Sequence, residues 1–95
     1  MKIVPQSLGC FADSWSRSLR NHYFNAQGRT KKEIIQLCAE EAYKRNWMTF
    51  GIQWHGECWG DGEAESRYSM YGVTTWCMNG LGGSLANDVY SIKGK

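Results

Sequence analysis

The sequence predicts a small α+β domain in which one helix packs on a mainly antiparallel sheet. The helix is indicated by Thr30-Lys31-Lys32-Glu33, a capping box followed by an apolar stripe at helical spacing. A strand is indicated over residues 48–54, where apolar side chains occupy every second position. Because 95 residues bury only about two-thirds of their surface on folding, we expect the whole chain, residues 1–95, to form one domain.

The other elements are expected from short apolar runs and from the turn residues that separate them. No repeat or low-complexity segment interrupts the series. The expected order is a short strand around residues 8–12, a long polar loop over 13–29, the helix from 31 to about 46, the strand at 48–54, a strand or turn at 57–59, an acidic loop at 61–66, segments at 67–71 and 73–77, a glycine-rich turn at 79–83 and a closing strand at 89–92.

The apolar side of the helix is expected to cover one face of the sheet. Its stripe consists of Ile34, Ile35, Leu37, Cys38, Ala42 and Tyr43. In the strand that follows, Phe50, Ile52 and Trp54 share one face, and we expect this face to meet the helix. The core is therefore the favoured position for Trp54, with a ligand-facing position as the alternative. Trp47, at the end of the helix, is expected to pack against the fold, and Trp15 in the long loop has no assigned role.

The chain contains four cysteines, and none of them lies in a Cys-x-x-Cys or other zinc-like spacing. Two disulfides are therefore a better interpretation than a metal site, and they make the domain disulfide-stapled. Disulfides persist in oxidising compartments, so the sequence predicts a secreted or extracellular location. No apolar run reaches membrane-spanning length, and no membrane insertion is expected.

Aromatic residues are abundant and charges are unevenly distributed. Five Trp, five Tyr and three Phe make 14% of the chain, more than so small a core easily holds, so some are expected to face solvent and bind a partner. Residues 1–48 carry eight Lys and Arg against four Asp and Glu, and residues 49–95 carry three against five. The basic excess lies at the two ends of the helix, as expected for solvated helix ends. Nucleic-acid binding would need a stronger basic field.

Acidic and histidine residues give no catalytic or metal signature. Glu57, Asp61, Glu63 and Glu65 supply oxygen ligands of the kind that calcium prefers, but their spacing does not match an EF-hand loop. A solvated acidic loop is the simpler interpretation. Neither histidine stands in a triad context, and so small a chain offers little room for a deep substrate cleft. No enzyme activity, metal or cofactor is therefore expected.

Several short segments, taken in order, resemble a WSC domain over about residues 8–92. They are Gly9-Cys10-Phe11-Ala12-Asp13-Ser14, Arg17-Ser18-Leu19, the helical Cys38, Phe50-Gly51-Ile52-Gln53, Glu57-Cys58-Trp59-Gly60 and Gly82-Gly83. The resemblance implies an extracellular module that binds carbohydrate and has a fold akin to PAN/apple domains.

The chain departs from this family in its cysteines. WSC domains usually carry eight, whereas here Ala42 and Gly60 stand at the positions of the second helical cysteine and of the second cysteine in the turn. Leu81 replaces the cysteine of the late Cys-Gly-Gly. Joint loss at 42 and 60 corresponds to removal of one helix-to-turn disulfide. The resemblance then implies that the remaining cysteines pair as Cys38–Cys58 and Cys10–Cys77.

This pairing selects the candidate binding residues. If Cys58 points inward to meet the helix, Trp59 points outward and becomes the best stacking platform for a sugar ring. Trp76 stands in the same relation to Cys77. The further candidates are Asp61, Arg67, Tyr68, Tyr71, Asn87 and Asp88. For the last four, the alternative is that the tyrosines pack the second face of the sheet and that the Asn-Asp pair shapes a turn.

Two functions follow from these expectations. The first is a non-catalytic carbohydrate-binding module or small lectin, in which exposed aromatic rings stack on a glycan and polar side chains take its hydroxyls. The alternative is a PAN/apple-like module that binds a protein partner, with aromatic side chains and Arg as the interface anchors.

Overall fold

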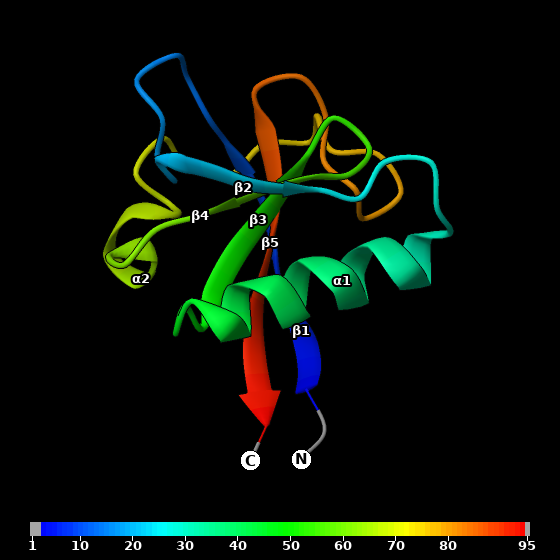
Figure 1. Ribbon diagram of the computed structural model, residues 1–95. Coiled ribbons are helices and arrows are strands. Elements are labelled where there is room, and N and C mark those ends of the chain that lie inside the picture. The colour runs from blue at the N-terminus through cyan, green and yellow to red at the C-terminus, as the bar shows by residue number, and fades with distance from the viewer. Residues whose placement is uncertain (1–2, 95) are drawn as a thin grey trace.

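The computed structural model describes residues 3–94 as a five-stranded sheet with two helices, and the α+β prediction is confirmed (Figure 1). Neither helix in this range is long and apolar enough to cross a membrane. The elements are β1 (Ile3–Ala12), β2 (Asn21–Asn25), α1 (Lys31–Lys44), β3 (Thr49–Gln53), β4 (Glu57–Gly60), α2 (Ala64–Arg67) and β5 (Ala86–Gly94).

The sheet has the strand order β1-β5-β3-β4-β2, and every neighbouring pair is antiparallel. The first and last strands pair along their whole length, from Ile3 opposite Gly94 to Ala12 opposite Ala86. The two chain ends therefore lie together at one end of the sheet, and most of the long connections gather at the other (Figure 1). Candidate ligand-contacting side chains are thus concentrated at the loop end.

Helix α1 begins and packs as its sequence predicts. The Thr30 hydroxyl accepts from the Glu33 amide at 3.2 Å, and the Glu33 carboxylate accepts from the Thr30 amide at 3.1 Å. Ile34, Cys38, Ala39 and Ala42 are buried, and they form the core with Phe50 and Ile52 of β3. Helix α1 therefore covers one face of the sheet, as Figure 1 shows.

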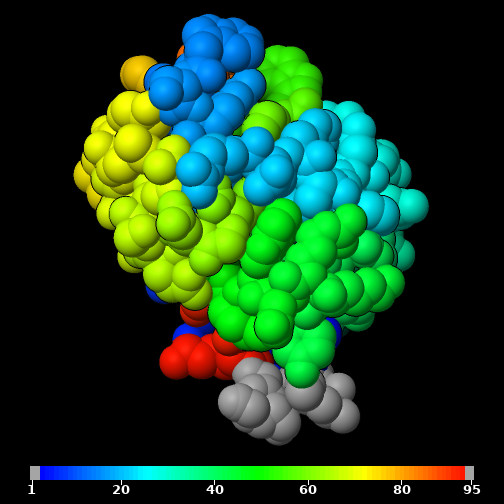
Figure 2. Space-filling view, turned by 60° about the vertical axis from the view of Figure 1, so that its left-hand side comes forward, coloured from blue at the N-terminus to red at the C-terminus, as the bar shows by residue number. Residues whose placement is uncertain are grey.

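The other face of the sheet is covered by the loop over residues 13–20 and by α2. A side chain at Gly51 would point away from α1 and would meet Leu19 at 2.9 Å, so Leu19 lies on this second face. Arg67 at the end of α2 holds the loop in place by donating to the carbonyls of Ser18 at 2.7 Å and Arg17 at 2.8 Å. Figure 2 shows this loop, in blue, directly above the yellow segment that contains α2.

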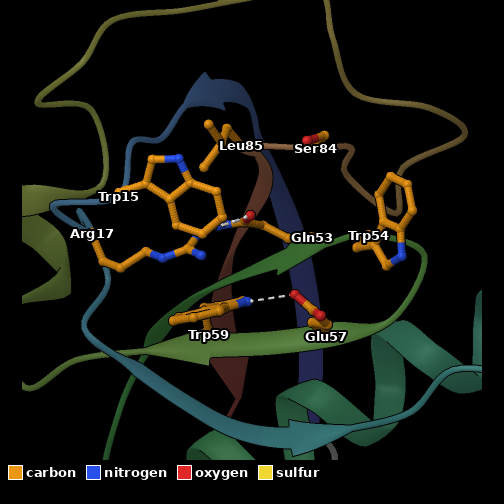
Figure 3. Close-up of a pocket in the computed structure, with 8 residues that line it drawn as sticks. All are labelled: Trp15, Arg17, Gln53, Trp54, Glu57, Trp59, Ser84 and Leu85. Carbon is orange, nitrogen blue, oxygen red and sulfur yellow. Dashed lines mark hydrogen bonds between the residues drawn. The ribbon is translucent and has the colours of Figure 1, made fainter.

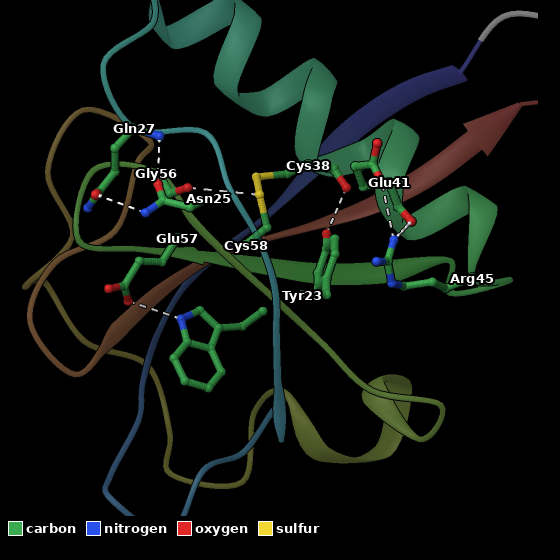
Figure 4. The surroundings of a disulfide bond; sticks show 10 residues. Tyr23, Asn25, Gln27, Cys38, Glu41, Arg45, Gly56, Glu57 and Cys58 are labelled. Atoms are coloured by element: carbon green, nitrogen blue, oxygen red, sulfur yellow. Dashed lines mark hydrogen bonds and ion pairs between the residues drawn. A yellow bond between two sulfur atoms is a disulfide. The ribbon is translucent and has the colours of Figure 1, made fainter.

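Both disulfides form in the pairing that the resemblance implied. Cys38–Cys58 joins α1 to β4 with a Cα–Cα distance of 5.4 Å (Figure 4). Cys10–Cys77 joins β1 to the irregular segment before the glycine-rich turn, with a Cα–Cα distance of 6.0 Å. Near the first bridge, the Tyr23 hydroxyl donates to the Cys38 carbonyl at 2.7 Å, which ties β2 to the same helix (Figure 4).

Two sequence-based expectations are wrong. Strand β1 begins at Ile3, earlier than expected, because β5 runs equally far and pairs with it. The polar loop over 13–29 contains β2, whose sequence Asn-His-Tyr-Phe-Asn lacks an apolar alternation and which becomes a strand by pairing with β4. The segment at 73–77, for which no element was predicted, makes one isolated β-bridge between Val73 and Phe11.

Candidate functional site

A pocket of about 330 Å³ opens at the loop end of the sheet, on the face away from α1 (Figure 3). It is lined by the loop over 13–20, the end of β3, the turn that joins β3 to β4, β4 itself and the segment just before β5. The lining residues are Trp15, Arg17, Gln53, Trp54, Glu57, Trp59, Ser84 and Leu85.

A buried polar network fixes the floor of the pocket. Asp13, which is buried, accepts from Gln53 Nε2 at 2.5 Å and from Arg17 Nη1 at 3.2 Å through one carboxylate oxygen. Its other oxygen accepts from the Ser18 amide at 2.8 Å. Arg17 Nη1 also reaches Gln53 Oε1 at 3.3 Å. The carboxylate of Asp13 thereby holds both polar side chains of the floor and balances the charge of Arg17.

The Arg17 guanidinium lies between two tryptophans. Its central carbon is 4.9 Å from the Trp15 ring centroid and 4.4 Å from that of Trp59. Trp59 also stacks on His22 of the neighbouring strand, with ring centroids 5.0 Å apart and planes at 16°. The indole of Trp59 is therefore partly covered, whereas Trp15 remains 82% exposed. As expected, Trp59 lies on the face opposite Cys58, and it lines the pocket.

Trp54 is the second exposed indole of the pocket, and its assignment to the core is wrong. It is 52% exposed, because β3 ends at Gln53 and the chain turns sharply. Trp54 and His55 have φ values of 47° and 67°, a left-handed backbone that costs a non-glycine residue about 1–2 kcal/mol. Gln27 Nε2 donates to the Trp54 carbonyl at 2.6 Å, and the His55 amide donates to the Leu81 carbonyl at 3.1 Å.

Leu85, on the other side of the pocket, also has a left-handed backbone, with a φ of 50°. Its carbonyl accepts from the Asp13 amide at 2.8 Å, so this strained residue is tied to the carboxylate that holds the floor. Strained non-glycine backbone persists only where its surroundings enforce it, and it is concentrated at binding sites. Its recurrence at two lining residues, Trp54 and Leu85, marks this pocket as a functional candidate.

Glu57 is the acidic residue of the pocket. Its Oε1 accepts from Trp59 Nε1 at 3.2 Å. Across residues 3–94, no Lys or Arg forms an ion pair with it, in contrast to Asp13 and Asp61. The pocket therefore holds one compensated pair, Asp13 with Arg17, and one uncompensated carboxylate, which leaves it with a net negative charge.

Most of the other candidate residues brace the fold instead of lining the pocket. Asp61 is buried and accepts from Arg20 Nε at 2.5 Å and Nη2 at 2.9 Å, and these bonds hold the pKa of the Asp61 carboxyl well below its usual range. Arg67 serves backbone carbonyls of the 13–20 loop. The Tyr71 hydroxyl donates to the Ser16 carbonyl, and Tyr68 packs edge-on against Phe11 at 5.0 Å. None of these four side chains lines the pocket.

The remaining candidates lie elsewhere. Asn87 is completely buried against Leu19 and Gly51, so it cannot reach a ligand on the surface. Asp88 is buried on β5 and accepts from the Gly82 amide at 2.9 Å, and this burial raises the pKa of its carboxyl. Trp76 is 64% exposed but does not line the pocket.

The sequence indicated Trp59 as the stacking candidate, and Trp59 lines the pocket, but most of the other lining residues were not among the candidates. Arg17 entered only as part of the WSC resemblance, Trp15 had no role, and Trp54 was placed in the core. One available signal was His55-Gly56 directly after Trp54: a turn at that point ends the strand before the alternation reaches Trp54.

Comparisons with protein-family models, with curated proteins and with solved structures found no match. Across residues 3–94, no group of three or more His, Cys, Asp and Glu side chains is arranged to hold a metal ion. The geometry of the pocket is therefore the main basis for a functional proposal.

Proposed function

We propose that this domain binds a saccharide in the pocket of Trp15, Trp54 and Trp59 and does not cleave it. The observation that carries the proposal is the composition of the pocket: three indoles from three separate segments surround a floor of amide, guanidinium and carboxylate groups. A sugar ring has apolar C–H faces that pack on an aromatic plane, and hydroxyls that both donate and accept. The pocket offers partners for both.

The exposed indoles and the polar floor have distinct roles in this proposal. Trp15 and Trp54 are 82% and 52% exposed, so their ring faces are accessible to a ligand. Gln53, whose amide is fixed by Asp13, and Glu57 supply hydrogen-bond partners from the sheet itself. A volume of about 330 Å³ is at the small end of ligand sites, which span about 300–1,000 Å³, and suits a short saccharide.

Binding without hydrolysis is supported by the carboxylates. Most glycosidases use two acidic residues that flank the scissile bond. Among the described residues that line the pocket, Glu57 is the single acid, and the nearby Asp13 is fully engaged by Arg17, Gln53 and Ser18. A module that holds a glycan therefore fits this pocket better than an enzyme does.

The family resemblance belongs to the same proposal. We infer a WSC-like domain with reduced cysteine content and a PAN/apple-like fold, secreted from the cell. The two disulfide pairs that the resemblance implied are present, and disulfides are typical of extracellular modules. These points support the resemblance, while the absence of two helix-and-turn cysteines separates this chain from usual family members.

The test compares Trp54→Ala with Trp76→Ala on a glycan array and in titrations with the best glycan. Both residues are exposed tryptophans, but only Trp54 lines the pocket. Loss of one stacked ring is expected to weaken binding by roughly tenfold or more, about 1.4 kcal/mol, in Trp54→Ala and to leave Trp76→Ala unchanged. Equal loss in both variants, or release of reducing ends by the wild-type protein, would refute the proposal.

A second candidate is a protein-interaction module, favoured by exposed apolar side chains outside the pocket. Val73, Trp76 and Met78 are all well exposed in the segment that Cys77 ties to β1. Aromatic and Met side chains are enriched at protein interfaces. Binding that a free saccharide does not compete with, and that Trp76→Ala abolishes, would support this function instead.

A further inference from the structure

We propose that the pocket selects saccharides that carry positively charged amines over neutral and acidic ones. This inference rests on the proposed function, because it names the ligand class of the same pocket. Three features support it. The Glu57 carboxylate has no ion-pair partner among residues 3–94, and the Trp54 indole has no cation over its ring there. The other two indoles, Trp15 and Trp59, already bind a cation, the Arg17 guanidinium.

The charge balance of the pocket comes first. Arg17 is the cation nearest to the ligand space, but it is paired with the buried Asp13 at 3.2 Å and also bonded to Gln53. Arg20 lies outside the lining and is paired with Asp61 and Glu63. Glu57 has no such partner among residues 3–94. A ligand in the pocket therefore meets one net negative charge.

The indoles add to this preference. A cation over the face of Trp is attracted by the quadrupole of the ring, and Trp is the most favourable aromatic residue for this contact. Trp15 and Trp59 already hold the Arg17 guanidinium at 4.9 and 4.4 Å. Trp54 has no Lys or Arg over its ring in the described chain, and its one aromatic neighbour, His55, is tilted by 48°. Among the lining residues, Trp54 is thus the one indole with no protein cation over its ring.

Glu57 and Trp54 are placed to act on the same group. Figure 3 shows Glu57 on the rim of the pocket between Trp59 and Trp54, on the side away from Arg17. The bond from Trp59 Nε1 occupies one carboxylate oxygen, Oε1, and fixes the side chain. An ammonium on a bound sugar is attracted by the carboxylate and by the Trp54 ring, whereas a uronic acid is repelled by Glu57.

The experiment measures calorimetric affinities for four β-linked trimers that differ in the charge of their substituents: glucosamine, N-acetylglucosamine, glucose and glucuronic acid. The measurements are made near pH 6, where the amine of the glucosamine trimer is largely protonated. A trimethylated glucosamine trimer keeps its positive charge at every pH, so it is measured both near pH 6 and at pH 8. The variants are Glu57→Gln, which keeps an acceptor for Trp59, and Glu65→Gln, a matched loss of charge at an exposed residue outside the pocket.

We expect the glucosamine trimer to bind about tenfold tighter than the N-acetylglucosamine trimer, a difference of about 1.4 kcal/mol. Glu57→Gln should reduce this ratio to within about twofold. The ratio is the readout, because the Glu57 side chain also offers a hydrogen-bond partner to neutral trimers. Glu65→Gln should retain the full ratio. Weakening of the preference at higher salt is expected as well, since a half-exposed ion pair is screened.

The failure of this inference and the failure of the proposed function give different results. If neutral or acidic trimers bind as tightly as the glucosamine trimer, or if Glu65→Gln lowers the ratio as much as Glu57→Gln does, the charge preference is refuted while saccharide binding stands. If no saccharide binds, both are refuted. Tighter binding of a trimethyl-lysine peptide than of every saccharide would also refute both and assign the cation-binding pocket to a protein partner.

Discussion

Asp13 is the residue on which the pocket floor depends, and its replacement by Asn is the sharpest structural test. In Asp13→Asn, the new Nδ2 stands where Oδ2 accepted from Gln53 Nε2 and Arg17 Nη1. If the Gln53 amide rotated, its Oε1 would accept from the new Nδ2. The rotation would also turn Gln53 Nε2 toward Arg17, which at present donates to Gln53 Oε1. The largely buried Arg17 therefore loses its counter-charge whichever way Gln53 points.

The magnitude follows from these contacts. A hydrogen bond to a charged group contributes about 1.5–3 kcal/mol, and breaking a fully buried ion pair costs about 3–5 kcal/mol. The Asp13 side chain has no exposed surface but that of Arg17 is 20% exposed, so we expect a loss near the lower figures, about 2–3 kcal/mol. For a domain of this size, that lowers the Tm by roughly 10–20 °C.

The assay is urea unfolding of a double-mutant cycle with Arg17→Gln, which removes the charge that Asp13 balances. Asp13→Asn should cost distinctly less in the Arg17→Gln background, with a coupling energy of about 1–2 kcal/mol. A cost below about 0.5 kcal/mol in the wild-type background, within the range of an ordinary surface change, would refute the argument. So would an equal cost in both backgrounds, since the ion pair would then contribute nothing.

Two further predictions concern stability. Replacing the Cys38–Cys58 pair by alanines should lower the free energy of unfolding by about 3 kcal/mol, and replacing the Cys10–Cys77 pair should lower it by about 4 kcal/mol. The costs differ because the sequence separations that the two disulfides close are 20 and 67. Urea unfolding that reverses this order would contradict the chain-entropy explanation. Asp88→Asn should stabilise the fold at neutral pH, since burial raises the pKa of Asp88 and penalises its charged form, while Asn keeps an acceptor for the Gly82 amide. This gain in the free energy of unfolding should be full above the raised pKa of Asp88 and should vanish as the pH falls toward about 3.9, the ordinary pKa of Asp. Unfolding curves that show the same gain at pH 7 and near pH 4 would exclude ionisation of Asp88 as its cause.

The sequence by itself determined the elements whose stabilising contacts are local. The capping box at Thr30 and Glu33 joins residues three apart, and the apolar stripe of α1 repeats within each turn, so both can be read from the chain. Phe50 and Ile52 alternate on β3 and are buried as the period predicts. The disulfide pairing was implied by the resemblance of several segments, taken in order, to a WSC domain, so it too could be predicted from the sequence alone.

The pocket, in contrast, was decided by tertiary contacts between distant parts of the chain. Arg17 is held by Gln53, 36 residues later in the sequence, and Asp13 by the backbone of Leu85 across the pocket. Trp54 points to solvent because the Gln27 side chain and the Leu81 carbonyl stabilise a left-handed turn that no local propensity favours. Strand β2 likewise exists because β4 pairs with it. Periodicity and capping report interactions within a few residues, whereas these side chains take their positions from partners that only the folded chain brings together.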